Sequence, residues 1–273
     1  MDNESRVFAP RILEGRSALV TGGGSGIGLG IAGCLGAAGA RVAIASRSME
    51  RLETGAERLR GAGIETLALE ANVREPDSIR NAVLATAEGF GSVDILVNNA
   101  AGNFYAPSES LSPNGWRAVV ETDLYGTFFS SQAVFPFMRD AGYGRIVSIS
   151  MTLHYRGWPQ MAHACAAKAG IDALTRTLAL EWAEHGITVN AVAPGPIPTE
   201  GVRKAFTPPN DEAPDPFAVQ RATEEFAKEA IPLGRMGDPE DIGNMVTYLV
   251  SPAADWVTGA IFVVDGGGSL KGA

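Results

Sequence analysis

A glycine-rich turn near the start of the chain contains the residue types that most directly indicate chemistry. It runs from Thr21 to Gly28, after the apolar stretch 17–20 and before a helical pattern. Glycines permit positive φ angles and close approach of a ligand to the backbone, and the helix start offers unpaired N–H groups and a positive dipole end. This Gly-x-x-x-Gly-x-Gly pattern at a strand-to-helix junction predicts a dinucleotide pyrophosphate site; the alternative is a glycine loop without a ligand. The residues expected to form the site are Gly22, Ser25, Gly26, Ile27 and Gly28.

A second candidate group follows the next apolar strand, 41–45. A dinucleotide fold contacts the adenosine ribose about 20 residues beyond the glycines, where an acid favours NAD. This chain has Ser46 and Arg47 there instead. A guanidinium can bind a 2′-phosphate through a charge-assisted pair, so the sequence predicts NADP. The alternative is that Arg47 is a solvated residue at a helix start.

Amide and small side chains follow the apolar strand 93–97. The segment is Asn98-Asn99-Ala100-Ala101-Gly102. Ligands of open α/β sheets lie outside the carboxyl ends of the strands. We therefore expect Asn99, Ala100 and Ala101 to line the cofactor crevice.

Two ionisable residues and one loop are further candidates for chemistry. Asp123 lies among apolar neighbours in the helix predicted over 113–139, and periodicity does not decide whether it is buried and functional or turned to the surface. Lys168 lies in the Ala/Leu-rich helix predicted over 164–183. The loop 151–163 carries groups that could face a substrate or simply pack: His154, Tyr155, Trp158 and His163.

The elements that position these residues alternate between strands and helices along the chain. That alternation predicts a doubly wound, Rossmann-like parallel sheet of the α/β class. The 273 residues, 45% of them hydrophobic, suit a single domain spanning 1–273. We expect residues 1–15 to form an N-terminal arm. The segment 200–230, rich in proline and mixed charge, is expected to be a substrate lid, the alternative being a passive surface insertion.

Charge and cysteine content restrict the partners and the compartment. The net charge is −9 without a basic block, so neither nucleic acid nor an acidic membrane is an expected partner. No apolar run reaches membrane-spanning length and no signal segment precedes the first strand. The two cysteines provide neither a metal spacing nor a disulfide framework. Together with a C-terminus that lacks a peroxisomal tripeptide, these features predict a cytoplasmic protein without a metal site.

Taken together, these motifs resemble the short-chain dehydrogenase/reductase family over about residues 14–268. The resemblance rests on the glycine turn, the Asn98-Asn99-Ala100 turn, Lys168 and the segments 194–199 and 264–267. It implies a nicotinamide cofactor, with its adenine near Asn72 and Val73 and its ribose on Lys168. Its carboxamide would lie by Ile197, after Pro194 and Gly195.

The chain departs from this family at the positions that carry its usual chemistry. The family's catalytic tyrosine lies four residues before the lysine, where this chain has Ala164. Its catalytic serine lies thirteen residues earlier, which is Met151 here, and a structural asparagine is replaced by Asp123. Ordinary interconversion of carbonyls and alcohols is therefore not expected.

One branch of the family, the 2,4-dienoyl-CoA reductases, resembles the chain in these departures. The similar segments include 100–104, 166–169 and 193–201, and the similarity is closest to the peroxisomal type, which also lacks the tyrosine and has an acid at the position of Asp123. The resemblance implies NADPH-dependent reduction of a dienoyl-CoA thioester in unsaturated fatty acid oxidation. Two alternatives stay open: reduction of another activated alkene or carbonyl, and NADP binding without turnover.

In that chemistry the site must stabilise an oxyanion and supply a proton at carbon. A water held by Asp123 and Lys168 could supply it, with Tyr155 as a second candidate donor. Burial would raise the pKa of Asp123 and Lys168 would lower it, and the sequence does not decide between the two. Arg156, Arg203 or Lys204 are expected to contact the CoA phosphates, unless they are solvated surface charges. The family resemblance further suggests a homotetramer.

Overall fold

In a computed structural model, which describes residues 11–199 and 224–271, the chain forms one seven-stranded sheet. All neighbouring strands are parallel, in the order β3-β2-β1-β4-β5-β6-β7. This confirms the predicted doubly wound α/β fold. The strands are β1 Ser17–Thr21, β2 Arg41–Ser46, β3 Thr66–Glu70, β4 Ile95–Asn98, β5 Gly144–Ile149, β6 Ile187–Pro194 and β7 Ile261–Val264.

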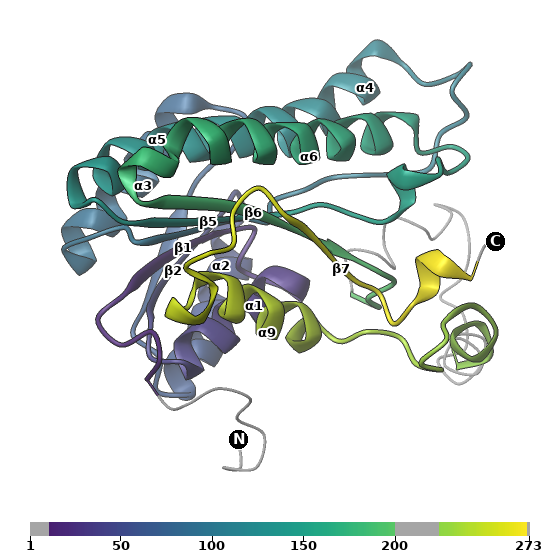
Figure 1. The fold of residues 1–273 in the computed structure, drawn as a ribbon. Helices are drawn as coiled ribbons and strands as arrows, with labels where there is room; N and C mark the ends of the chain where they lie inside the picture. Colours follow the sequence, from purple (N-terminus) through teal and green to yellow (C-terminus); the bar gives the residue numbers. More distant parts are fainter. Residues whose placement is uncertain (1–10, 200–223, 272–273) are drawn as a thin grey trace.

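Helices cover both faces of this sheet (Figure 1). One layer holds α3, α4, α5 and α6, and the other holds α1, α2 and α9. Their bounds are α1 Gly26–Ala37, α2 Met49–Gly61, α3 Pro76–Phe90, α4 Pro113–Val120, α5 Gly126–Ala141, α6 Ala162–Trp182 and α9 Pro239–Val250. A π-helical turn, η2 (Glu121–Tyr125), joins α4 to α5, and 3₁₀ turns occupy η3 Leu153–Tyr155, η4 Ala183–His185, η5 Pro252–Ala254 and η6 Gly268–Leu270. Within 11–199 and 224–271, none of these helices is both long and apolar enough to cross a membrane.

Local sequence signals account for where several of these helices begin. Helices α3, α4 and α9 each have a proline in the first turn, where the missing N–H has no intrahelical partner to lose. Ser112 caps α4 by accepting a hydrogen bond from the Gly115 N–H, and Asp238 and Asp241 form a capping box at α9.

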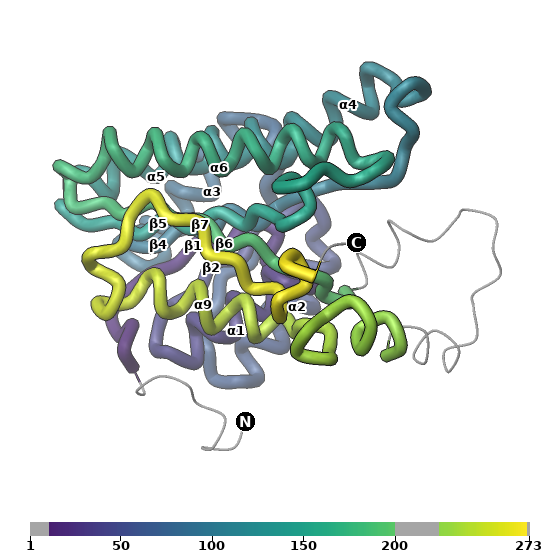
Figure 2. The backbone as a smooth tube through the Cα atoms, turned by 45° about the vertical axis from the view of Figure 1, so that its right-hand side comes forward, coloured from purple at the N-terminus to yellow at the C-terminus, as the bar shows by residue number. Residues whose placement is uncertain are grey.

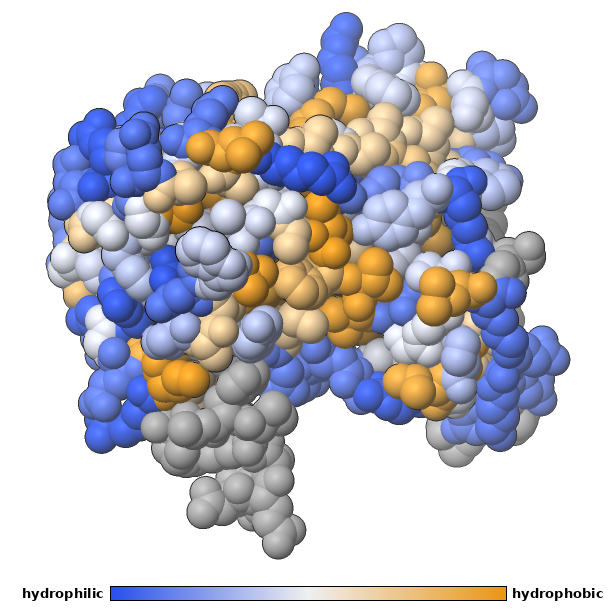
Figure 3. All heavy atoms as spheres, viewed as in Figure 1, coloured by the Kyte–Doolittle hydropathy of each residue, from blue (hydrophilic) through white to orange (hydrophobic). Residues whose placement is uncertain are grey.

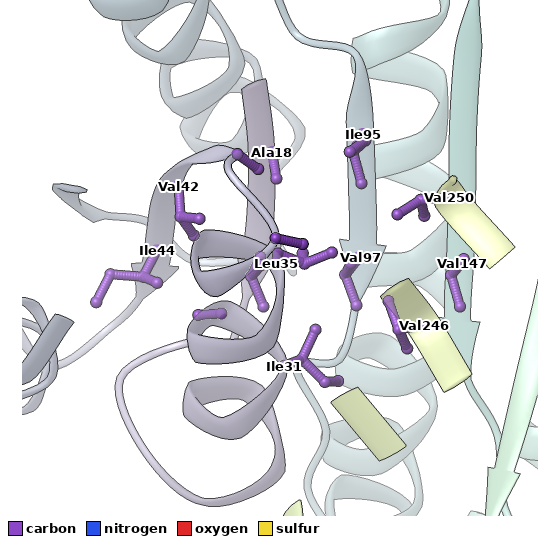
Figure 4. Packing of buried hydrophobic residues seen from close by; sticks show 14 of the residues in the cluster. Ala18, Ile31, Leu35, Val42, Ile44, Ile95, Val97, Val147, Val246 and Val250 are labelled. Atoms are coloured by element: carbon purple, nitrogen blue, oxygen red, sulfur yellow. The ribbon is translucent and has the colours of Figure 1, made fainter. Parts of the chain in front are cut away.

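Two apolar cores fill the space between the sheet and its helix layers. Figure 4 shows the first, where Ile31 and Leu35 of α1 pack against Val97 of β4 and Val246 of α9. Helices α1 and α9 run side by side (Figure 2). Their axes approach closely because both carry glycine at the contact: a Cβ on Gly243 would lie 2.5 Å from the Cys34 sulfur. The second core lies on the other face, between the sheet and α3, α5 and α6.

Residues 11–15 differ from the predicted arm. Leu13 is fully buried in the first core, and its N–H donates to the Ala38 carbonyl at 2.9 Å. Residues 11–15 are therefore anchored to the domain, because the apolar side chain of Leu13 packs into its core before β1. Residues 1–10 and most of the predicted lid, 200–223, lie outside the described residues. Residues 224–230 are helical, and Ala227 is buried.

The strand order reverses between β1 and β4, since the chain leaves β1 toward β2 on one side and returns to β4 on the other. Such a switch point opens a crevice at the carboxyl ends of the two strands. The glycine turn follows β1 there and the Asn98-Asn99-Ala100 segment follows β4. The fold thus brings two segments predicted to bind cofactor to one place.

Candidate active site

The glycine turn has a backbone that other residues would not adopt freely. Gly22 and Gly26 have φ angles of 66° and 54°, in the left-handed region that favours glycine. A Cβ on Gly28 would overlap the Gly22 carbonyl oxygen and lie 2.5 Å from Asn99 Nδ2. The absence of side chains at these positions leaves the backbone open to a ligand.

The start of α1 follows this turn without a side-chain cap from its N-cap residue. Ser25 occupies the N-cap with φ −161°, but its hydroxyl makes no capping hydrogen bond. The first-turn N–H groups, including that of Ile27, therefore have no partner from a cap. The segment after β6 crosses this region: the Thr199 methyl lies 3.2 Å from where a Gly26 Cβ would be. A helix start of this kind, with a segment lying over it, is suited to an anion.

The ends of β1 and β4 are joined by a compact hydrogen-bond network. The Thr21 hydroxyl accepts the N–H groups of Asn99 at 3.0 Å and Ala100 at 3.1 Å. Asn99 Nδ2 donates to the carbonyls of Thr21 and Gly22 at 3.0 and 3.2 Å. The Asn99 side chain thus supports the glycine turn, and the half-buried Ala100 and exposed Ala101 follow it at the carboxyl end of β4.

Residues expected at the adenosine end lie after β2 and β3. Arg47 is exposed beyond β2, with no acidic partner among the described residues. Ser46 Oγ donates to the Ser48 carbonyl at 3.4 Å. Asn72 Nδ2 donates to Glu75 at 2.6 Å, and Val73 is buried, where a Gly126 Cβ would meet it at 2.8 Å. The cation at Arg47 is therefore available to an anionic ligand.

The segment after β6 closes the crevice on its other side. The Gly195 N–H donates to the Val264 carbonyl at 2.9 Å, and a Cβ on Gly195 would lie 2.6 Å from that of Asp265. Ile197, after Pro194 and Gly195, is buried. The glycine cradle, the open helix start and this covering segment fit a dinucleotide. Such a nicotinamide cofactor, when bound, supplies hydride chemistry.

Asp123 owes its position to the π-helical turn η2. The Gly126 N–H donates to the Glu121 carbonyl, which inserts one residue into the helical repeat between α4 and α5. Such insertions often occur at functional sites. The Asp123 side chain is 1% exposed, so the structure resolves the open choice in favour of burial.

Asp123 and Lys168 form a buried ionisable pair. Asp123 Oδ1 accepts the Gly102 N–H at 2.8 Å, while Oδ2 has no hydrogen-bond partner in the described part and lies 3.4 Å from Lys168 Nζ. Lys168 Nζ donates to the Ile149 carbonyl at 2.8 Å. Burial raises the pKa of Asp123, and the Lys168 charge and the Gly102 N–H offset only part of that rise. A buried carboxyl with an elevated pKa beside an ammonium group is suited to proton transfer.

His163 is a neighbour of this pair that the sequence had placed only in a mixed loop. It lies in the first turn of α6, fully buried, with its ring edge-on to Phe104 at 4.6 Å between centroids. The backbone carbonyls of Met161 and Phe104 lie near its ring nitrogens, although neither makes a hydrogen bond of good geometry within the described residues. Burial lowers its pKa, and the Asp123 charge acts in the opposite direction. A loop assignment concealed this proximity, because the helix begins two residues earlier than predicted.

An apolar wall replaces the hydroxyl groups that the wider family uses. Ala164 is fully buried and packs in one cluster with Val119 and Met161. Met151, Leu153 and Trp158 border this cluster. The ionisable pair of Asp123 and Lys168 comes from η2 and α6, which also carries Ala164.

Tyr155 and Arg156 lie further out. Tyr155 is 48% exposed, and its ring packs on His154 at 4.3 Å between centroids. Arg156 lines an open pocket of about 550 Å³ with Tyr105 and Trp158. Arg203 and Lys204 lie outside the described residues. Within the described ranges, no three His, Cys, Asp or Glu residues are grouped to hold a metal.

The fold and this crevice define a dinucleotide-dependent oxidoreductase. The sequence profile of the family described as Enoyl-(Acyl carrier protein) reductase matches residues 22–269. The chain belongs to the short-chain dehydrogenase/reductase family, as the glycine turn and Lys168 predicted.

Several relatives and solved structures are similar to the whole chain. A zebrafish (Danio rerio) protein named peroxisomal 2,4-dienoyl-CoA reductase, (3E)-enoyl-CoA-producing, is 42% identical, covering 100% of this chain and 88% of its own length. A Bacillus subtilis probable 2,4-dienoyl-CoA reductase, (2E)-enoyl-CoA-producing, is 36% identical over 93% of this chain and 97% of its own length. A structure of an actinorhodin polyketide ketoreductase variant with NADPH superposes with a TM-score of 0.86 at 36% identity, covering 96% and 99% of the two chains.

Proposed function

We propose that this enzyme reduces 2,4-dienoyl-CoA thioesters with NADPH. The observation that carries the proposal is the buried Asp123–Lys168 pair beside Ala164, where the family's hydroxyl acid is missing. Relatives that carry the dienoyl-CoA reductase name at about 40% identity support the same substrate class.

The chemistry of a conjugated thioester explains why a missing tyrosine is tolerated. Reduction of a ketone needs an acid fixed beside the carbonyl oxygen. In a dienoyl thioester, hydride addition at the far carbon spreads negative charge to the thioester oxygen, which donors must stabilise before one proton reaches carbon. Asp123 in its protonated form, directly or through a water, supplies that proton, and the Lys168 cation lowers the free energy of the charged intermediate. Tyr155 is the second candidate for the proton donor.

NADPH is proposed over NADH because Arg47 is an exposed cation after β2, where the ribose of a dinucleotide lies, and has no acidic partner within residues 11–199 and 224–271. A guanidinium recognises a phosphate by paired, charge-assisted hydrogen bonds. Ser46 adds a hydroxyl at the same strand end. The acyl-CoA phosphates are assigned to the pocket of Arg156, whose guanidinium lies 5.9 Å from the Trp158 ring centroid.

The enzyme is further proposed to act as a cytoplasmic homotetramer. Apolar side chains gather across the middle of the face that carries β7 and α9 (Figure 3), and Val263 of the edge strand β7 is exposed. Tyr125 and Phe128 are exposed on η2 and α5. Cys34 and Cys165 are free thiols, compatible with a reducing compartment. Light scattering coupled to size exclusion tests the assembly, and cell fractionation tests the location, with the peroxisomal relatives as the contrasting case.

The deciding experiment follows NADPH oxidation with a panel of acyl-CoA esters. We expect turnover with 2,4-dienoyl-CoA and none with the saturated or 3-ketoacyl thioesters, since Ala164 cannot protonate a ketone oxygen. Tight NADPH binding without oxidation by any ester would instead support a binding protein. Turnover with the ketone alone would support a carbonyl reductase.

A further inference from the structure

A second buried carboxylate lies one helical turn after Lys168. Asp172 and Lys168 are four residues apart on α6, so their side chains lie on one face of the helix. Both reach the end of β5: Lys168 Nζ donates to the Ile149 carbonyl at 2.8 Å, and Ser150 Oγ donates to Asp172 Oδ1 at 2.6 Å. The consecutive residues Ile149 and Ser150 are therefore bound by Lys168 and Asp172 from one face of α6.

The second oxygen of Asp172 holds the loop that follows. His154 Nε2, in the turn η3, lies 2.8 Å from Asp172 Oδ2. Ser150, His154 and Asp172 are all at least nine-tenths buried as side chains. Because a buried carboxylate is costly without partners, these two hydrogen bonds are needed to keep it in place.

The segment enclosed by these two bonds contributes to the apolar wall. Met151 and Leu153 lie between Ser150 and His154, and both pack against the cluster that contains Ala164. Arg156 and Trp158 follow two and four residues after His154. Movement of His154 away from α6 would therefore displace the wall and the mouth of the proposed acyl-CoA site together.

We propose that Asp172, acting through His154, is a positioning residue for substrate binding: it fixes the 151–158 loop against α6 so that the thioester is held beside Asp123 and Lys168. The kinetic part of this inference rests on the proposed function. Loss of the anchor is expected to weaken acyl-CoA binding and leave NADPH binding unchanged, since the glycine turn and Arg47 lie on other elements and Lys168 keeps its own hydrogen bond to the Ile149 carbonyl.

The test uses His154, because removing Asp172 would leave two buried donors without their acceptor. His154→Leu removes the hydrogen bond, and His154→Gln retains an amide donor. In His154→Leu we expect KM for 2,4-dienoyl-CoA to rise about tenfold, the effect of one hydrogen bond to a charged group. The Kd for NADPH should stay unchanged, and His154→Gln should recover much of the loss. His185→Leu, at the opposite end of α6 in η4, is the matched control.

Hydrogen–deuterium exchange provides a readout that needs no substrate. Peptides covering 151–161 should exchange faster in His154→Leu than in His154→Gln or His185→Leu, while peptides covering α1 stay unchanged. Equal KM and equal exchange in the two His154 variants would overturn the proposal, as would faster exchange without a change in KM. If no dienoyl-CoA ester supports NADPH oxidation by the wild type, the proposed function fails. The exchange result still decides whether His154 anchors the loop.

Discussion

In the half of the molecule built from β1, α1 and β2, the groups proposed to bind cofactor belong largely to the backbone. In the half built from η2, α6 and the end of β5, the candidate groups are buried side chains. The glycine turn excludes side chains, since a Cβ on Gly28 would overlap the Gly22 carbonyl. The other half pairs the buried side chains of Asp123 and Lys168, 3.4 Å apart.

This difference explains how one family can keep a cofactor site and change its reaction. A backbone cradle depends on φ angles and close contacts, which few substitutions respect. A side-chain site can exchange a tyrosine for Ala164 and a serine for Met151, provided that the wall packs and another group moves the proton. The following predictions test this division, from the largest expected effect to the smallest.

Substitution Gly28→Ala should have the largest effect. The new Cβ would displace the Gly22 carbonyl, so we expect NADPH affinity to fall at least about a hundredfold, nearly 3 kcal/mol. Fluorescence titration of NADPH measures this. Gly33→Ala is the control, because its nearest neighbour, Leu59 Cδ2, is 4.0 Å away; it should stabilise α1 by about 0.5–1 kcal/mol. Normal binding by Gly28→Ala would remove the argument for a backbone cradle.

Substitution Asp123→Asn should lower kcat about 10²- to 10⁴-fold, the usual contribution of a general acid, and leave the Kd for NADPH unchanged. The surface variant Asp140→Asn serves as its control. An acid donor must be protonated, and burial raises the pKa of Asp123 above 3.8. Activity should therefore be fully present below this raised pKa and decline as pH rises through it. Steady-state pH profiles measure that decline, and an Asp123→Asn enzyme with wild-type turnover would exclude the role.

Substitution Arg47→Ala should weaken NADPH binding about 10- to 100-fold, the value of a charge-assisted hydrogen bond. NADH binding should change little, because it lacks the 2′-phosphate. Parallel titrations with the two nucleotides measure the difference, with the exposed Arg58 of α2 as the control site. An equal loss of affinity for both nucleotides would mean that Arg47 supports the fold and does not bind the 2′-phosphate.

Substitution Tyr155→Phe should have the smallest effect, with kcat within about threefold of wild type, less than a general acid contributes. Tyr155 is half exposed, and its ring packs on His154. Burial and the Asp172 charge raise the pKa of its hydroxyl, so it remains a phenol at neutral pH. A hundredfold loss of kcat would transfer the donor role from Asp123 to Tyr155.

Much of the fold follows from the sequence because its signals are local. Apolar strands, glycine and proline at element ends, and the glycine turn predict the parallel sheet and its cofactor crevice. The family and the oxidoreductase class were likewise predicted from motifs at fixed spacing, and the comparisons confirm them. The predicted arm shows the limit of such signals, since Leu13 is held by distant residues of the first core.

The sequence by itself determined the cradle, the lysine and the loss of the family tyrosine, because these depend on residue identity and spacing along the chain. Only the tertiary structure decided that Asp123 is buried, that His163 lies near it and that Asp172 joins β5 to the following loop. Those relations depend on a π-helical insertion that rotates the helix face and on the packing of α6 against β5. Neither is encoded in the hydrophobic periodicity of one segment, since each arises where separate elements meet.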